Sequence, residues 1–232
     1  MIESAPLSWF HDGRATELWR LSGEGQAGLA PLEQLAGLVD DCAALLAGQE
    51  LALENLVHQR LWLRDRAMRA EIDAPRRILL GDARRAASSS FFSATRFAKG
   101  GDVALDLLVQ RPVDRGSRRL VDFIPPRRYA WYLLQDGWQH FSGMAETAAN
   151  LSMQFDAACG EIERGLIVEG RDWAALTEAH LFLERGRGDE AWLRRAFAMR
   201  SGLAPSRIVF DWVDGLASID KHLEIEAVAR PL

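Results

Sequence analysis

The chain has 232 residues, of which 48% are hydrophobic and 26% are charged, and its formal net charge at pH 7 is −5. This size and composition are typical of a globular protein with one large or two small domains. The acidic balance, without a long basic run, argues against a nucleic-acid partner. No apolar run approaches the roughly 18 residues that a membrane span needs, and residues 1–6 do not resemble a signal peptide. We therefore expect a cytoplasmic protein with no membrane partner.

The first half of the chain opens with two apolar runs separated by Asp12-Gly13, which predicts a β-hairpin because glycine tolerates the backbone of a tight turn. Apolar residues at three- and four-residue steps then predict a helix over 31–46. The remaining predicted elements are a strand over 56–64, a polar helix over 65–80 broken at Pro75, and strands over 89–95 and 103–109.

The second half repeats this order of elements. It reads as a hairpin over 129–141, a helix over 150–168, a strand over 176–183, a helix over 189–200, and strands over 207–213 and 222–229. Ser22-Gly23 recurs 120 residues later as Ser142-Gly143, and Leu105-Asp106-Leu107 recurs as Leu223-Glu224-Ile225. The repeat predicts two tandem β-β-α-β-α-β-β domains over 5–112 and 129–230, joined by a polar, proline-containing linker over 113–128.

Metal and disulfide sites are not expected. Cys42 and Cys159 lie in separate helical patterns and read as small buried side chains. None of the histidines shows the spacing of metal ligands; they are His11, His58, His140, His180 and His222.

The second half resembles the reactive-intermediate deaminase (Rid, YjgF-like) family. The resemblance rests on the Ser142-Gly143 pair that ends the hairpin, on Pro205-Ser206-Arg207 at the start of a strand, on the closing strand 223–229, and on Tyr129 thirteen residues before Ser142. It implies an α+β chain of tandem chorismate-mutase-like (Rid-like) domains, each a mixed sheet backed by two helices. Because three such domains close one barrel in that family, it also implies a homo-oligomer, with three chains favoured.

The activity that the resemblance implies is hydrolysis of an enamine or imine of the 2-imino acid type to an oxo product and ammonia, without a cofactor. Arg207 would bind the substrate carboxylate through its planar guanidinium, and Glu224 would orient water and move the proton. Tyr129, Ser142 and Gly143 would complete the substrate-binding site. The alternative readings are a surface ion pair for Arg207, a solvated sheet face for Glu224 and a packing role for Tyr129.

The first half departs from the family pattern. Ser89, or a neighbour in Ser88-Ser89-Ser90, stands where the arginine is expected, and Trp9 stands where the tyrosine is, although Ser22 and Asp106 are retained. A carboxylate substrate without a cationic partner would be costly to bury, so we expect the C-terminal domain to carry the activity. The alternatives are a chorismatase-like hydrolase that acts on another small carboxylate, and a non-catalytic small-ligand-binding or assembly protein.

Overall fold

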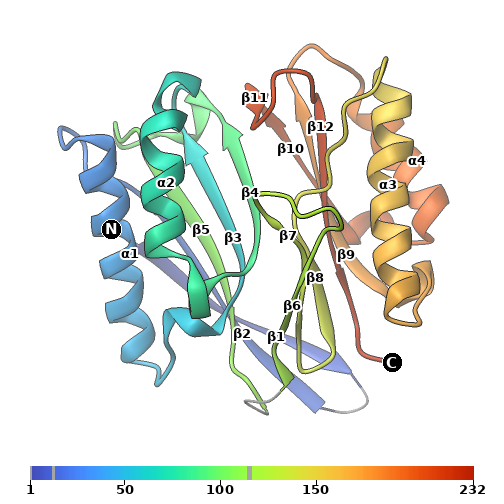
Figure 1. The fold of residues 1–232 in the computed structure, drawn as a ribbon, viewed down its shortest axis with the longest axis horizontal. Helices are drawn as coiled ribbons and strands as arrows, with labels where there is room; N and C mark the ends of the chain where they lie inside the picture. The colour runs from blue at the N-terminus through green and yellow to red at the C-terminus, as the bar shows by residue number, and fades with distance from the viewer. Residues whose placement is uncertain (1, 12–13, 114–116) are drawn as a thin grey trace.

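Two halves of similar architecture lie side by side in the computed structural model, which describes residues 2–11, 14–113 and 117–232 (Figure 1). The first half contains β1 (Ile2–His11), β2 (Arg14–Glu24), α1 (Pro31–Ala47), β3 (Leu56–Leu63), α2 (Arg69–Leu79), β4 (Ala87–Phe92) and β5 (Val103–Gln110). The second half contains β6 (Arg119–Asp122), β7 (Ala130–Gln135), β8 (Trp138–Phe141), α3 (Leu151–Val168), β9 (Leu176–Glu184), α4 (Glu190–Ser201), β10 (Ile208–Val213), β11 (Gly215–Leu216) and β12 (Leu223–Ala229).

Each half is built on a six-stranded mixed sheet. The strand order is β1-β2-β5-β3-β4-β11 in one sheet and β10-β9-β12-β8-β7-β6 in the other. β3 pairs in parallel with β4, and β9 pairs in parallel with β10, while the other neighbours are antiparallel. The predicted α+β fold with two tandem chorismate-mutase-like units is confirmed.

The helices cover the two outer faces of the molecule. α1 and α2 lie against the first sheet on one side, and α3 and α4 lie against the second sheet on the other (Figure 1). Each helix pair encloses a separate apolar core with its own sheet. None of the helices that the structure describes is long and apolar enough to cross a membrane.

The inner faces of the two sheets meet in the middle of the molecule. Phe91 on β4 stacks on Phe182 on β9, with 4.0 Å between the ring centroids, and Trp62 on β3 packs against both rings. A smaller cluster joins Leu18 and Val57 to Leu133 of the second half. These contacts fix the halves relative to each other, so side chains from both can form one site.

Three local features differ from the sequence-based expectation. β6 forms inside the segment predicted as a linker, and β11, although it follows β10 in the chain, pairs with β4 of the first sheet. Helix α2 continues through Pro75, so the predicted break is wrong. Pro75 has no backbone N–H, so the carbonyl oxygen four residues earlier receives no helical hydrogen bond. That carbonyl lies in the first turn of α2, and the rest of the helix keeps its hydrogen-bonding pattern. The predicted turn at Asp12-Gly13 lies outside the described residues.

Candidate active site between the two halves

The two halves are joined by hydrogen bonds at the end of β8. The Ser88 N–H on β4 donates to the Ser142 hydroxyl at 3.0 Å, and the Gly143 N–H donates to the Ser88 carbonyl oxygen at 3.2 Å. Ser142 is fully buried and serves in this bridge, so its predicted contact with a ligand is replaced by a structural one. The bridge places the Ser88-Ser89-Ser90 segment opposite Gly143.

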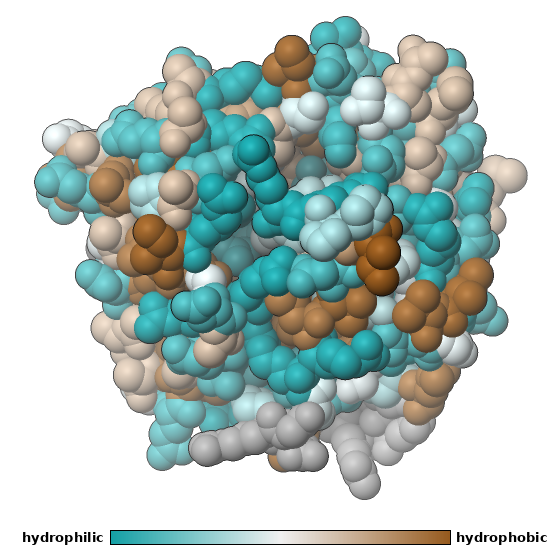
Figure 2. Space-filling view, in the orientation of Figure 1, coloured by the Kyte–Doolittle hydropathy of each residue, from teal (hydrophilic) through white to brown (hydrophobic). Residues whose placement is uncertain are grey.

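A cavity of about 580 Å³ opens beside this bridge. α2 and β4 of the first half form one wall, and the other wall comes from residues 127–129, 143–147 and 216–224. The corresponding face of the molecule is hollowed near its centre, and hydrophilic side chains surround the hollow (Figure 2). The predicted site residues Tyr129, Gly143 and Glu224 all line this cavity, together with Ser89 of the first half.

Glu224 is the buried acid of the cavity. It is 5% exposed, and its Oε1 has no hydrogen-bond partner among the described residues. Burial, followed by the negative charge of Glu226, raises the pKa of Glu224 to about 8, while Lys221, Ser89 and Arg60 act in the opposite direction. Glu224 is therefore a neutral carboxylic acid at pH 7 and can donate a proton.

Gly143 is required by the position of this acid. A Cβ built on Gly143 would lie 1.7 Å from Glu224 Oε1. No side chain fits in that space, so the glycine permits the carboxyl group to approach the backbone of the second half.

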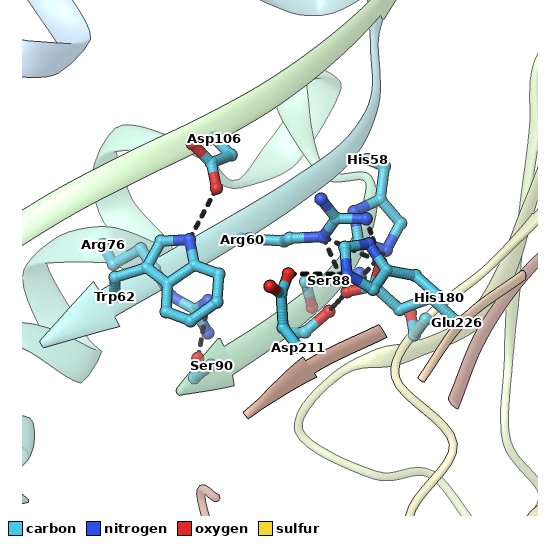
Figure 3. A network of polar contacts seen from close by, with 12 residues as sticks. His58, Arg60, Trp62, Arg76, Ser88, Ser90, Asp106, His180, Asp211 and Glu226 are labelled. Carbon is cyan, nitrogen blue, oxygen red and sulfur yellow. Dashed lines mark hydrogen bonds and ion pairs between the residues drawn. The ribbon is translucent and has the colours of Figure 1, made fainter. Parts of the chain in front are cut away.

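The wall of the cavity is strongly basic. Four of its six cations have no carboxylate within ion-pairing distance in the described part of the chain: Arg76 and Arg77 on α2, Arg128, and Lys221 before β12. Arg76 donates to the Ser90 hydroxyl at 3.2 Å (Figure 3), and Lys221 donates to the Ala145 carbonyl oxygen. The six basic side chains of the wall are Arg69, Arg76, Arg77, Arg127, Arg128 and Lys221. An anionic ligand would find unpaired cations on both sides of the cavity.

Tyr129 packs against an aromatic neighbour and also lines the cavity. Its ring packs edge-on against Phe123, and its hydroxyl accepts a hydrogen bond from Arg127 at 3.3 Å. Burial raises the pKa of Tyr129, so the phenol stays neutral. Arg127 also pairs with Glu146 and lies 3.4 Å from Glu161, which leaves it less available to a ligand than Arg76.

Arg207 is the predicted site residue that does not line this cavity. It lies exposed in the 3-10 turn Pro205–Arg207 that precedes β10, and its charge acts on Glu178. Ile208 at the start of β10 pairs with Ala179 of β9, whereas Leu223 at the start of β12 pairs with Leu183, further along β9. Arg207 is therefore offset along the sheet from Glu224.

The equivalent position in the first half has lost its free acid. Asp106, the counterpart of Glu224, accepts hydrogen bonds from Ser22 at 2.5 Å, from the Trp62 indole at 2.6 Å and from Arg96 at 2.9 Å. It borders a second cavity of about 430 Å³ between the halves. With its charge paired and its oxygens occupied, Asp106 is a structural group. The side chain of Trp9 lies outside the described part of the structure.

Sequence reasoning missed Arg76 and the other basic residues of α2. Residues 69, 73, 76 and 77 recur at helical spacing on one face, and all four line the cavity. That polar stripe was the available signal, but it reads equally well as a solvated helix face. In the described residues, no group of three or more His, Cys, Asp or Glu side chains is placed to hold a metal ion.

Comparison with solved structures identifies the fold. A crystal structure of chorismatase matches with a TM-score of 0.65 and 17% identity over 97% of this chain and 80% of its own. A YjgF family member from Neisseria meningitidis matches half of the chain (50%) at 25% identity with a TM-score of 0.40, and a Rid family protein from Yersinia pestis matches 49% at 15% identity with a TM-score of 0.43. The chain thus has a chorismatase-like fold. No family model and no curated protein matches the sequence.

Proposed function

We propose that this protein is a hydrolase for small carboxylates that carry an imine or enamine, and that Glu224 is its general acid. The observation that supports this proposal is a neutral, buried carboxyl group with an unpartnered oxygen, facing a cavity whose walls carry unpaired cations. Such an acid matches a reaction in which the substrate is protonated before water adds.

The proposed reaction begins with proton transfer from Glu224 to the substrate. The proton goes to the terminal carbon of an enamine, or to the nitrogen of an imine, and the result in both cases is an iminium ion. Water then adds to the sp² carbon, and one proton of that water returns to the Glu224 carboxylate, which leaves a carbinolamine. Glu224 then gives this proton to the carbinolamine nitrogen, the C–N bond breaks to release ammonia, and the hydroxyl proton passes to Glu224 as the carbonyl of the oxo acid forms. The ionised Glu224 also stabilises the cationic intermediate through its charge.

Arg76 and Lys221 are the proposed carboxylate ligands. A guanidinium donates two parallel hydrogen bonds to a carboxylate, and such charge-assisted bonds contribute roughly 1.5–3 kcal/mol each. Arg76 belongs to the first half of the chain, whereas Lys221 belongs to the second half, as Glu224 does. The site is therefore assembled from both halves, and the role first expected of Arg207 passes to Arg76.

A second candidate is a chorismatase-like hydrolase that acts on an enol ether. Two observations favour it: the whole-chain similarity to chorismatase, and the presence of more than one unpaired cation in the cavity wall, which suits a ligand with two carboxylates. The chemistry differs only in the leaving group, since protonation of the terminal carbon of an enol ether gives an oxocarbenium ion that water attacks in the same way.

The experiment that tests the function follows hydrolysis of 2-imino acids generated by an amino-acid oxidase, with chorismate as a second substrate. We expect the wild type to accelerate at least one reaction and Glu224→Gln to lower that rate by about 10² to 10⁴-fold. Asp106→Asn is the matched control, because it changes the paired carboxylate of the first half, and it should retain the rate. A wild type that matches buffer on every substrate would show that the proposed function is wrong.

A further inference from the structure

Two carboxylates stand next to each other on one face of β12. Glu224 and Glu226 are two residues apart on the strand, so both side chains point to the same side of the sheet. They pair with Phe182 and His180 of β9, and the Phe182 ring stacks on the first half. Both are almost completely buried, at 5% and 4% exposure. Two buried carboxylates this close cannot both be charged at low cost, so the surroundings must favour ionisation of one of them.

Glu226 has the partners that an ionised carboxylate needs. Arg60 Nε lies 3.0 Å from Oε1 and 2.8 Å from Oε2, and Arg60 Nη2 lies 2.5 Å from Oε2 (Figure 3). The Ser89 hydroxyl donates to Oε1, and His58 Nε2 lies 3.7 Å from the same oxygen. All three partners belong to the first half, on β3 and β4.

Glu224 lacks such partners although it is equally buried. Its Oε1 has no donor among the described residues, and Ser89, which lines the cavity beside it, gives its proton to Glu226 instead. Arg60 is likewise engaged with Glu226. The first half therefore directs its donors to one carboxylate of the pair and leaves the other for the cavity.

We propose that Glu226, held as an anion by Arg60 and Ser89, is a positioning residue whose negative charge keeps Glu224 protonated and able to act as an acid. The first half thus contributes to the protonation state of the acid of the second half through the charge that it holds on Glu226. The proposal rests on the proposed function only for its effect on rate, because the protonation state of Glu224 is measurable without a substrate.

The pKa values are consistent with this geometry. Arg60 and His58 outweigh burial and lower the pKa of Glu226 to about 2, whereas Glu226 is the charge that raises the pKa of Glu224 most. Other charged or titratable groups also face this pair: Lys221 before β12, Tyr129 beside the cavity, and Glu178 and His180 on β9. The His180 ring hydrogen-bonds to Asp211 at 2.7 Å.

The test is a titration of the glutamate carboxyl carbons by ¹³C NMR in the intact protein without substrate. Glu224→Gln identifies the Glu224 signal by its disappearance. We expect Glu226→Gln to lower the apparent pKa of Glu224 by about one unit or more, because the largest opposing charge is gone. Glu178→Gln is the matched control: it removes a half-buried carboxylate of β9 that interacts with Glu226 but is not among the groups that act on Glu224, so the titration of Glu224 should not change.

Loss of Glu226 alone leaves the Arg60 guanidinium buried and unpaired, which can prevent folding. The double variant Arg60→Gln/Glu226→Gln removes both charges. We again expect a lower apparent pKa of Glu224, since Glu226 acts on Glu224 more strongly than Arg60 does. An unchanged titration of Glu224 in a folded Glu226 variant, single or double, would overturn the proposal. If the wild type hydrolyses a substrate, the alkaline limb of its pH–rate profile should move to lower pH in the same variant. Failure of every substrate would contradict the proposed function but leave this inference to the NMR result.

Discussion

At the scale of single residues, two neighbouring glutamates differ in their surroundings. Glu224 and Glu226 sit on one strand, yet Glu226 is held by an arginine and a serine while Glu224 faces a cavity. The strand pattern of alternating glutamates and apolar residues in the sequence is compatible with a solvated face as well as with a buried one. The two glutamates differ only because Arg60 and Ser89 of the first half contact Glu226. These are tertiary contacts, so the sequence of the strand does not reveal them.

This difference predicts an unusual pH dependence of stability. The pKa of Glu224 is about 8 in the folded protein, and its ordinary value of 4.5 applies to the unfolded chain, so the folded state binds more protons between these values. Stability from this group is fully present below pH 4.5 and is lost as the pH rises towards 8, by on the order of 3–5 kcal/mol. Glu226 has the opposite sign, and its contribution is lost as the pH falls from 4.5 towards 2.

We therefore expect Glu224→Gln to remove most of the fall in stability between pH 5 and pH 8, because the amide does not ionise. Urea unfolding at several pH values measures this directly, with Asp106→Asn as the variant that should keep the wild-type slope. Parallel wild-type and Glu224→Gln curves over that pH range would contradict the assignment of Glu224 as a neutral buried acid.

At the scale of elements, the site depends on how closely the end of β8 approaches β12. Gly143 makes that approach possible, and the Ser88–Ser142 and Ser88–Gly143 bonds connect it to β4. The Ser-Gly pair was noticed in the sequence because it recurs in both halves. In the second half this pair forms hydrogen bonds to Ser88 of the first half. These bonds depend on how the two halves pack, so the Ser-Gly pair alone does not predict them.

Substitution of Gly143 should damage the site and the fold together. In Gly143→Ala the new methyl group overlaps the Glu224 carboxyl group, and we expect a loss of roughly 1–3 kcal/mol of stability with loss of activity. The control is Gly160→Ala in helix α3, where a Cβ meets no atom within 4 Å and the change should stabilise the helix by about 0.5–1 kcal/mol. Thermal unfolding of both variants measures the contrast, and equal behaviour would show that Glu224 does not pack against Gly143.

At the scale of the whole molecule, the repeat and the fold were accessible from the sequence, because both halves carry the same order of periodic patterns. The short strands β6 and β11 were not, since strands of four and two residues carry too little periodicity and are formed by sheet edges that other segments provide. Of the predicted site residues, Tyr129, Gly143 and Glu224 line one cavity. The sequence did not indicate Arg76 because the opposite wall of its cavity comes from the second half of the chain. The trimer stays a prediction.

The central claim is that one cavity between the halves binds the carboxylate, with Arg76 in the role first expected of Arg207. Its most direct test is a calorimetric titration of an unreactive 2-oxo acid into the wild type, Arg76→Ala and Arg207→Ala. We expect Arg76→Ala to weaken binding by about tenfold or more, since a charge-assisted hydrogen bond is lost, and Arg207→Ala to bind as the wild type does. Wild-type affinity in Arg76→Ala together with lost binding in Arg207→Ala would contradict this claim.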